Sequence, residues 1–306
     1  MQRSYLSLLS RLIIGTYQMQ TLQISNIICL WAKSEVSMRI TIITPSKNQG
    51  KYIAHCLSSI HGQTHRDFEH IVLDGMSNDE TAAVAVNYPC TFLQRKDSGP
   101  AQAINRGLDM ATGDIICWLN ADDAFWSSTT LERIVELFEE HPHVDVITGD
   151  GYYIDEAGKL VISLINERPN RLSLRWIKRG DPLLQPATFW RRNHFRLDES
   201  LSHCFDWKLW IDFWQAGLSV MYMPEYFALY RLHASSLTYQ DSASRRKEIY
   251  GMVKRYDRRL VQVVWCWIVW RMYQMAESLK SSNLKRLAGL ANTAMRELSG
   301  GRIHST

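Results

Sequence analysis

The chain has 306 residues, of which 46% are hydrophobic and 22% charged, a globular composition that allows one large α/β domain with additions or two modest domains. Its 35 lysines and arginines against 31 aspartates and glutamates leave a net charge of +4, which is too small to indicate a nucleic acid as partner. The six cysteines include no Cys-x-x-Cys pair, which excludes the zinc and redox motifs with that spacing. Free buried thiols in a reducing compartment, the cytoplasm, fit best.

Residues 1–37 fit neither a membrane helix nor a signal peptide. Gln18, Gln20 and Gln23 interrupt the apolar stretches, whereas a membrane helix needs about 20 mostly apolar residues. The order of charge, apolar core and small-residue cleavage site that marks a signal peptide is also missing. Met38 stands directly before the first strong strand pattern. We therefore expect the ordered domain to begin there, with 1–37 as an N-terminal extension that is disordered or a misannotated start.

From residue 39 onward, short β-branched runs alternate with segments of helical spacing. This alternation predicts an α/β fold with a doubly wound, mainly parallel sheet and helices on both faces. The expected strands are 40–44, 68–73, 91–94, 114–119 and 144–148. The expected helices are 52–60, 79–87, 100–111 and 128–140.

The alternation ends after residue 150. A hairpin is predicted at 152–161 around the turn sequence Glu156-Ala157-Gly158-Lys159, a helix at 205–216, and two short strands at 218–231. We expect this part to pack against the sheet. Residues 38–240 then form one domain.

Residues 241–306 are expected to form a helical tail. Basic residues gather at 244–259, and an apolar, tryptophan-rich run, VQVVWCWIVW, follows at 261–270. The run is too short to span a bilayer. Two interpretations stay open. The tail is either a helix packed on the main domain or an interfacial helix with a basic shoulder. The second would give peripheral contact through 241–275 at the inner face of the cytoplasmic membrane.

Three successive strands are followed by polar clusters: DGMSND at 74–79, KDSG at 96–99 and NADD at 120–123. Any one of them alone could be a solvated turn. In an open parallel sheet, however, ligands bind beyond the carboxyl ends of the strands, and all three clusters fall at that edge. Together they predict a polar crevice for a nucleotide and a hard cation.

The adjacent carboxylates Asp122 and Asp123 are the sharpest feature of this edge. Neighbouring acids repel unless a cation or separate partners neutralise them, and Mg²⁺ or Mn²⁺ is commonly shared between a carboxylate and substrate phosphates. Helix N-capping by Asp123 or Ser127 is the competing explanation. We assign Asp122 to the metal and leave Asp123 open between the two roles.

Other nucleotide-binding and hydrolytic motifs are missing from the sequence. The loop after the first strand reads PSKNQG at 45–50, so it lacks the Gly-x-Gly-x-x-Gly of dinucleotide-binding folds. A phosphate-binding loop and a Gly-x-Ser-x-Gly elbow are also absent. A nucleotidyltransferase would need a Gly-rich loop near the first strand, which Gly50 alone does not supply.

Seven segments, in order over residues 38–237, resemble the family 2 glycosyltransferases, which have the GT-A fold. The nucleotide-binding segments are ITIITPSKNQG (40–50), LDGMSND (73–79), DSGPAQAINRG (97–107) and TGDIICWLNADD (112–123). The acceptor segments are QPATFWRR (185–192), LDESLSHCFDWKLW (197–210) and YRLHASSL (230–237). The resemblance implies a nucleotide-binding half at 38–125 and an acceptor half at 126–240. The resemblance implies transfer from a nucleotide-diphosphate sugar, a UDP-sugar by preference, to a saccharide or lipid-linked acceptor, with inversion and without a covalent intermediate. It points to cell-surface polysaccharide or lipopolysaccharide synthesis.

The resemblance also implies residue roles. Asp206 matches the general base, and His233 matches a residue that reaches the metal or the diphosphate. The implied nucleotide-sugar site consists of Pro45, Ser46, Asp74, Asp97, Arg106, Asn120, Ala121 and Asp122, the last being the metal-binding acid of the Asp-x-Asp motif. Here Asn120 replaces the first acid of that motif. That replacement keeps an alternative open, a catalytically inactive sugar-nucleotide-binding protein of a membrane assembly.

Overall fold

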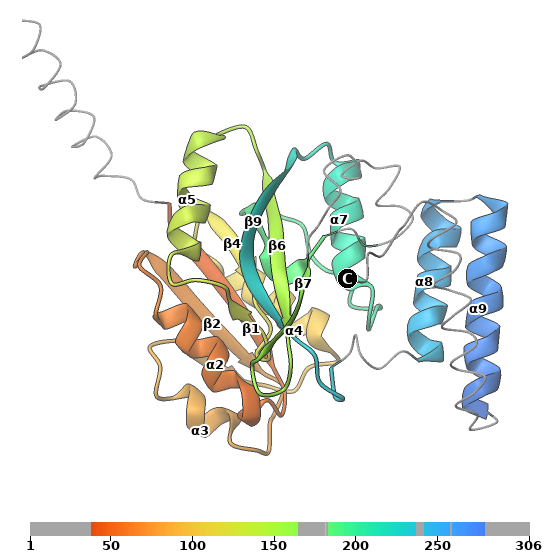
Figure 1. Ribbon diagram of the computed structural model, residues 1–306, viewed down its shortest axis with the longest axis horizontal. Helices are drawn as coiled ribbons and strands as arrows, with labels where there is room; N and C mark the ends of the chain where they lie inside the picture. Colours follow the sequence, from red (N-terminus) through yellow and green to blue (C-terminus); the bar gives the residue numbers. More distant parts are fainter. Residues whose placement is uncertain (1–37, 165–180, 182, 237–241, 258, 279–306) are drawn as a thin grey trace, which may run out of the picture. The chain divides into compact units, whose positions relative to one another are not determined.

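The computed structural model describes residues 38–164, 181, 183–236, 242–257 and 259–278 (Figure 1). The expectations for residues 1–37 and for the end of the tail lie outside these residues. The described strands form one nine-stranded sheet in the order β3-β2-β1-β4-β8-β6-β9-β5, with β7 paired to β6. Their bounds are β1 Ile40–Ser46, β2 Phe68–Asp74, β3 Thr91–Gln94, β4 Ile115–Trp118, β5 Ala124–Phe125, β6 Val146–Ile154, β7 Leu160–Leu164, β8 Thr188–Arg191 and β9 Val220–Arg231.

Strands β3, β2, β1 and β4 are parallel to one another, and helices cover both of their faces. Along β2, Val72 packs with Ile53 on one face, whereas Ile71 and Leu73 pack with Ile104 on the other. The helices are α2 Gly50–His61, α3 Thr81–Ala85, α4 Pro100–Met110, α5 Thr130–Glu140 and α7 Phe205–Gln215. Helices α2 and α3 share the first face, and α4 and α7 share the second. This arrangement confirms the doubly wound, mainly parallel sheet.

Two strands are longer than expected from the sequence, and each includes a proline. Strand β1 includes Pro45, which pairs with β2 on one side only, because β4 is paired with β1 no further than Ile43. No neighbouring strand therefore requires the missing N–H. The two strands expected at 218–231 are one strand, β9. Pro224 falls where the pairing of β9 with β6 shifts register around Gly149, and a bulge accommodates proline in the same way.

The second half of the sheet is mixed. Strand β6 overlaps the expected strand 144–148 from Val146 onward, but it runs antiparallel to β8 and parallel to β9. The short strands β5 and β8 were not predicted, and α3 is shorter than the expected helix at 79–87. The expected hairpin is present as β6–β7, and Gly158 supplies the left-handed residue of its turn with φ +85°.

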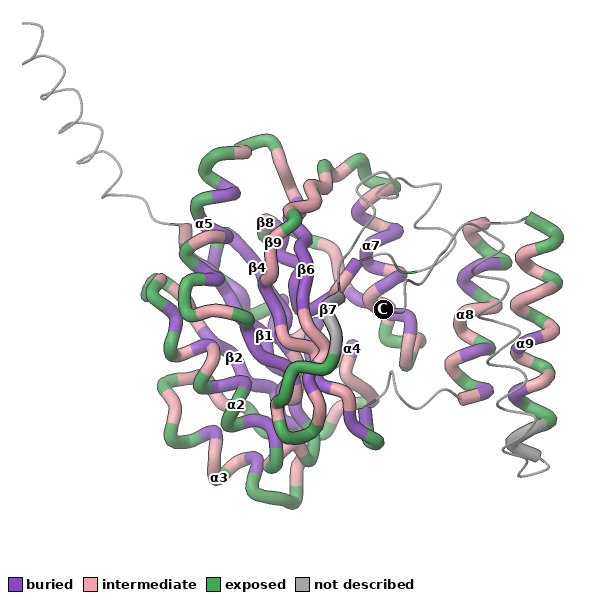
Figure 2. Tube along the Cα trace, in the orientation of Figure 1, coloured by how far each residue is buried: buried purple, intermediate pink, exposed green. Residues whose placement is uncertain are grey.

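The tail contains two helices, α8 Ala243–Tyr256 and α9 Leu260–Ser278. Met252 and Val253 of α8 belong to the same apolar cluster as α7. Figure 2 shows buried stretches in both of these helices. In α9, Trp270 stacks on Tyr250 with ring centroids 5.5 Å apart. No helix in the described part of the chain is long and apolar enough to cross a membrane.

Candidate active site

The ends of β1 and β2 place two of the predicted residues side by side. Ser46 pairs with Asp74 in the register of the two strands, and both residues are buried. The Asp74 carboxylate accepts hydrogen bonds from the Ser77 backbone and the Gln94 side chain, each at 2.8 Å, which fixes the following loop. The Ser46 hydroxyl has no hydrogen-bond partner within the described residues. A buried, unpartnered hydroxyl at this edge is suited to a polar ligand.

Asp97 and Arg106 form an ion pair between the loop after β3 and helix α4. Burial raises the pKa of Asp97, although the Arg106 guanidinium opposes that shift. Gly107, the next residue of α4, lies so close to the sheet that a Cβ there would come within 2.6 Å of Ile43. This close packing holds Arg106 at the edge of the sheet. Its Nε has no hydrogen-bond partner in the described part of the chain.

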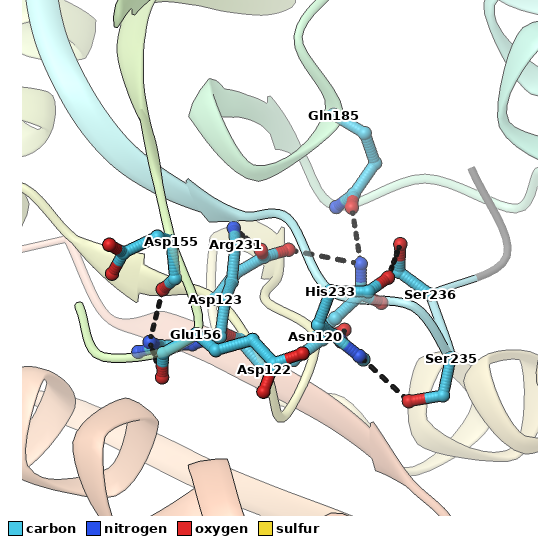
Figure 3. Close-up of polar contacts among 10 residues, drawn as sticks. All are labelled: Asn120, Asp122, Asp123, Asp155, Glu156, Gln185, Arg231, His233, Ser235 and Ser236. Atoms are coloured by element: carbon cyan, nitrogen blue, oxygen red, sulfur yellow. Dashed lines mark hydrogen bonds and ion pairs between the residues drawn. The ribbon is translucent and has the colours of Figure 1, made fainter. Parts of the chain in front are cut away.

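Asp122 and His233 come together from the loop after β4 and the segment after β9 (Figure 3). The distance between Asp122 Oδ2 and His233 Nε2 is 2.8 Å. The histidine side chain is 1% exposed and the aspartate side chain 16%. Ser235 Oγ lies 2.7 Å from His233 Nδ1, and the Tyr52 ring packs on the imidazole at 4.6 Å between centroids. These contacts orient the ring so that Nε2 faces the carboxylate.

Asp123 has a different role from its neighbour. Its carboxylate is buried and accepts the Arg231 backbone N–H at 2.9 Å and the Asn120 amide at 3.2 Å. Burial, and next the charge of Asp122, raise the pKa of Asp123. Helix α5 begins after Thr129, whose N–H donates to Ser127 Oγ at 3.2 Å. The capping role considered for Asp123 is therefore wrong, and this carboxylate instead fixes the loop.

Arg231 is a central residue of the site to which the sequence assigned no role. Its guanidinium donates to the backbone carbonyls of Asp122 at 2.9 Å, Asp155 at 3.0 Å and Glu156 at 3.1 Å (Figure 3). It also donates to His55 Nδ1 at 2.6 Å. Burial and the Arg231 charge lower the pKa of His55, which suits a neutral acceptor. Arg231 thus ties the Asp122 loop to the β6–β7 turn and to α2.

Asn120, in the place of the first acid of the motif, makes three hydrogen bonds, two of which require an amide donor. Its Oδ1 accepts the Trp118 indole N–H at 2.7 Å. Its Nδ2 donates to Asp123 and to Gln185 Oε1, each at 3.2 Å. Gln185, in the 3₁₀ turn Gln185–Ala187, donates in turn to the Trp118 carbonyl at 2.5 Å. A carboxylate at position 120 could not donate to Asp123. Ala121 is buried beside it and leaves Asp122 as the acid that reaches solvent.

Asp206, the expected base, is the second residue of α7. It accepts the Trp207 backbone N–H at 2.7 Å. Burial raises the pKa of Asp206 to about 6, against the opposing effect of Arg245. Asp181, which the sequence did not single out, is close enough to interact with it. Burial raises the pKa of Asp181 well above its usual range, and the charge of Asp206 adds a smaller effect in the same direction.

A hard divalent cation fits the Asp122–His233 pair. One carboxylate oxygen and one imidazole nitrogen face each other from well-fixed side chains. The described residues contain no cluster of three or more His, Cys, Asp or Glu side chains able to hold a metal. Phosphate oxygens of a nucleotide would therefore have to complete the coordination, as is usual for Mg²⁺.

In an open, mainly parallel sheet, ligands bind beyond the carboxyl ends of the strands, and acidic, basic and hydroxyl groups gather at that edge here. Residues 41–197 match the family described as glycosyl transferase family 2, and the chain belongs to that family. It has the GT-A fold, as the resemblance implied.

Relatives in sequence match part of the chain. A PGL/p-HBAD biosynthesis glycosyltransferase of Mycobacterium bovis is 37% identical over 116 residues, which cover 36% of this chain and 45% of that protein. A glycosyltransferase of Rickettsia prowazekii is 28% identical over 214 residues, covering 65% of each chain. The match therefore spans less than two thirds of the length of either relative.

Two solved structures share the fold. TarS of S. aureus in complex with UDP-GlcNAc has a TM-score of 0.56 at 18% identity, covering 75% of this chain and 70% of that one. The mannosyltransferase PcManGT of Pyrobaculum calidifontis, in complex with GDP-Man and Mn²⁺, has a TM-score of 0.58 at 16% identity, covering 86% and 81%. At these identities the likeness concerns the fold alone.

Proposed function

We propose that this glycosyltransferase moves a hexose from a nucleotide-diphosphate sugar, a UDP-sugar by preference, to an acceptor hydroxyl with inversion and with Mg²⁺ or Mn²⁺. The observation that carries the proposal is the fixed Asp122–His233 pair at the ligand edge of the sheet, 2.8 Å between Oδ2 and Nε2. The nucleotide-sugar complexes of the two structural relatives, one of them with Mn²⁺, support it.

The residues divide the work of a single displacement. Asp206 takes the proton of the acceptor hydroxyl as its oxygen forms a bond to the anomeric carbon. The bond from that carbon to the diphosphate oxygen breaks, and its electron pair leaves with the diphosphate. Asp122 and His233 would hold a cation that, when bound, neutralises the leaving group, and Arg106 adds a fixed positive charge near it.

The inactive binding protein remains the weaker alternative. It depended on Asn120, which removes one possible metal contact. The structure offers another explanation for an asparagine at position 120, because its amide hydrogen-bonds to Asp123 and Gln185 and holds them in place. The raised pKa of Asp206 also supports catalysis, because strongly shifted pKa values are typical of catalytic residues.

Donor binding is the first test of the proposal. We expect one of UDP-Glc, UDP-Gal, UDP-GlcNAc and GDP-Man to raise the melting temperature in the presence of MnCl₂ and much less in EDTA. A ligand at 100 times its Kd stabilises the folded state by about 2.7 kcal/mol. UDP and GDP alone serve as controls for the contribution of the sugar. A screen in which no nucleotide sugar stabilises the chain would contradict the proposal.

The pH dependence of transfer reports on the base. Asp206 must be ionised to accept a proton, and its folded-state pKa is raised to about 6. We therefore expect kcat/KM to be full above this value and to fall as the pH decreases through about 6, rather than near the ordinary aspartate pKa of about 4. The measurement is kcat/KM for the acceptor between about pH 5 and pH 8, with donor and metal at saturating concentrations. A kcat/KM that stays constant down to about pH 5 would rule out this assignment.

We also propose that the tail contacts an anionic membrane, which would place the enzyme beside a lipid-linked acceptor. Leu260, Val261, Val264 and Trp267 lie along one exposed side of α9. The last turn of α8 adds two exposed cations, Lys254 and Arg255. Near an anionic membrane surface, each basic residue contributes about 1 kcal/mol to binding. Arg259 is paired with Asp257 at 2.8 Å, and Arg258 lies outside the described residues.

Vesicle flotation tests this contact with point variants, because removing the tail would also take Met252 and Val253 out of the core. We expect the wild type to float with phosphatidylglycerol-containing vesicles and the double variant Val261→Asp, Val264→Asp to stay in the dense fraction. Val86→Asp, at an equally exposed valine next to α3, is the matched control and should float. Equal flotation of both variants would show that α9 is not the contact.

A further inference from the structure

Helix α8 places one carboxylate against the segment that leads into α7. Glu248 accepts hydrogen bonds from three consecutive backbone N–H groups, those of Ser202 at 2.9 Å, His203 at 2.9 Å and Cys204 at 3.1 Å. Cys204, the residue at the N-cap position of α7, makes no side-chain capping bond. Glu248 therefore supplies from another helix the acceptors that this helix start lacks, and its negative charge lies at the positive end of the α7 dipole.

The geometry of the contact depends on both carboxylate oxygens. Oε1 accepts from Ser202, and Oε2 accepts from His203 and Cys204. A glutamine of the same shape would turn an amide NH₂ toward one of these donors and lose at least one of the bonds. The segment is thus held by a charged, two-oxygen acceptor and not simply by the size of the side chain.

The same side of α8 also acts on the charges around the base. Arg245, one helical turn before Glu248, opposes the raised pKa of both Asp206 and Asp181, whereas Glu248 adds to the raised pKa of Asp206. Met252 anchors the following turn of the helix in the core that contains α7. One rigid, packed face of α8 therefore meets the start of α7, where Asp206 is the second residue.

We propose that Glu248 is a positioning residue for Asp206, so that helix α8, which lies beyond the residues 41–197 matched by the family, is part of the catalytic apparatus. Glu248 acts by fixing the backbone of 202–204 and, through it, the direction in which the Asp206 carboxylate meets the acceptor hydroxyl. The inference rests on the proposed role of Asp206 as the base. A misplacement of a catalytic group by about 1 Å can cost about 100-fold in rate.

The test compares Glu248→Gln with Glu139→Gln, a control at an exposed glutamate of α5. The donor is UDP-GlcNAc or GDP-Man, whichever gives the larger thermal shift. Activity is measured as the release of UDP or GDP from this donor in the presence of MnCl₂, with water as the acceptor. We expect Glu248→Gln to lower kcat by about 10- to 100-fold and to leave the donor-induced thermal shift unchanged. Amide hydrogen exchange at 202–204 should become faster. The acidic limb should move to lower pH, because a negative charge near Asp206 is removed while Arg245 and Asp181 remain.

A double-mutant cycle separates positioning from general damage to the fold. In the Asp206→Asn background, Glu248→Gln should cost no further activity, since its effect passes through Asp206. If Glu248→Gln does not fold, Glu248→Asp, which keeps the charge but shortens the reach, should show the same pattern more weakly. Activity equal to that of Glu139→Gln, or losses that add in the double variant, would overturn the inference alone. Full activity of Asp206→Asn would overturn the proposed function and this inference with it.

Discussion

Replacing Asp122 by asparagine is expected to abolish metal-dependent donor binding and to reduce transfer by at least about 10²–10³-fold, the range for removing a strong electrostatic stabiliser. The fold should stay intact, because asparagine has the same shape and can still hydrogen-bond to His233. Asp122 is also the acid of the pair that reaches solvent, whereas Asp123 is committed to Arg231 and Asn120.

The measurement is the Kd of the selected nucleotide sugar, with MnCl₂ and with EDTA, for Asp122→Asn and for a control, Asp67→Asn, at an exposed aspartate before β2. The control should behave as the wild type in both conditions. Metal-dependent binding that survives in Asp122→Asn would remove Asp122 from the metal site.

Replacing Asp206 by asparagine is expected to lower the transfer rate by about 10²–10⁴-fold, the usual contribution of a positioned base. Donor affinity should not change, because the base acts on the acceptor. The carboxylate at the start of α7 has its pKa raised to about 6 by burial, which lets it accept a proton near neutral pH.

Asp181→Asn distinguishes the two interacting carboxylates. Asp181→Asn should leave most of the rate, since Asp206 remains able to accept the proton. Loss of transfer in Asp181→Asn with retention in Asp206→Asn would make Asp181 the base. A fall in donor affinity in Asp206→Asn, with transfer per bound donor unchanged, would make Asp206 a donor ligand.

Most of the parallel half of the sheet could be predicted because β1, β2 and β4 are buried on both faces. A continuous run of β-branched residues, such as that of β1, is typical of a strand that is buried on both faces. Strands β5 and β8 were missed because they are short and pair with distant partners, which no local pattern records. Residues 218–231 were expected to form two strands, although the bulge opposite Gly149 lets β9 continue through Pro224.

The candidate site was predictable where one segment carries the chemistry. Asp122 follows a buried strand, so its position at the ligand edge could be inferred from the local sequence. His233 came only from the family resemblance, and its contact with Asp122 spans 111 positions. Arg231, Gln185 and Glu248 act on backbone groups far away in sequence. Their roles depend on the folded arrangement, and a single sequence contains no signal for such contacts.

The most direct test of sugar transfer at this site is the configuration of the sugar that the enzyme releases. UDP-Glc, UDP-Gal, UDP-GlcNAc and GDP-Man are all α-linked, and with water as acceptor a single displacement assisted by Asp206 must give the β anomer first. Proton NMR of the first product, with MnCl₂ present, distinguishes the two anomers. We expect the wild type to release the nucleoside diphosphate together with β sugar from one of these donors. Release of the α anomer, or no release above that of the Asp122→Asn, Asp206→Asn double variant from any of them, would contradict the account.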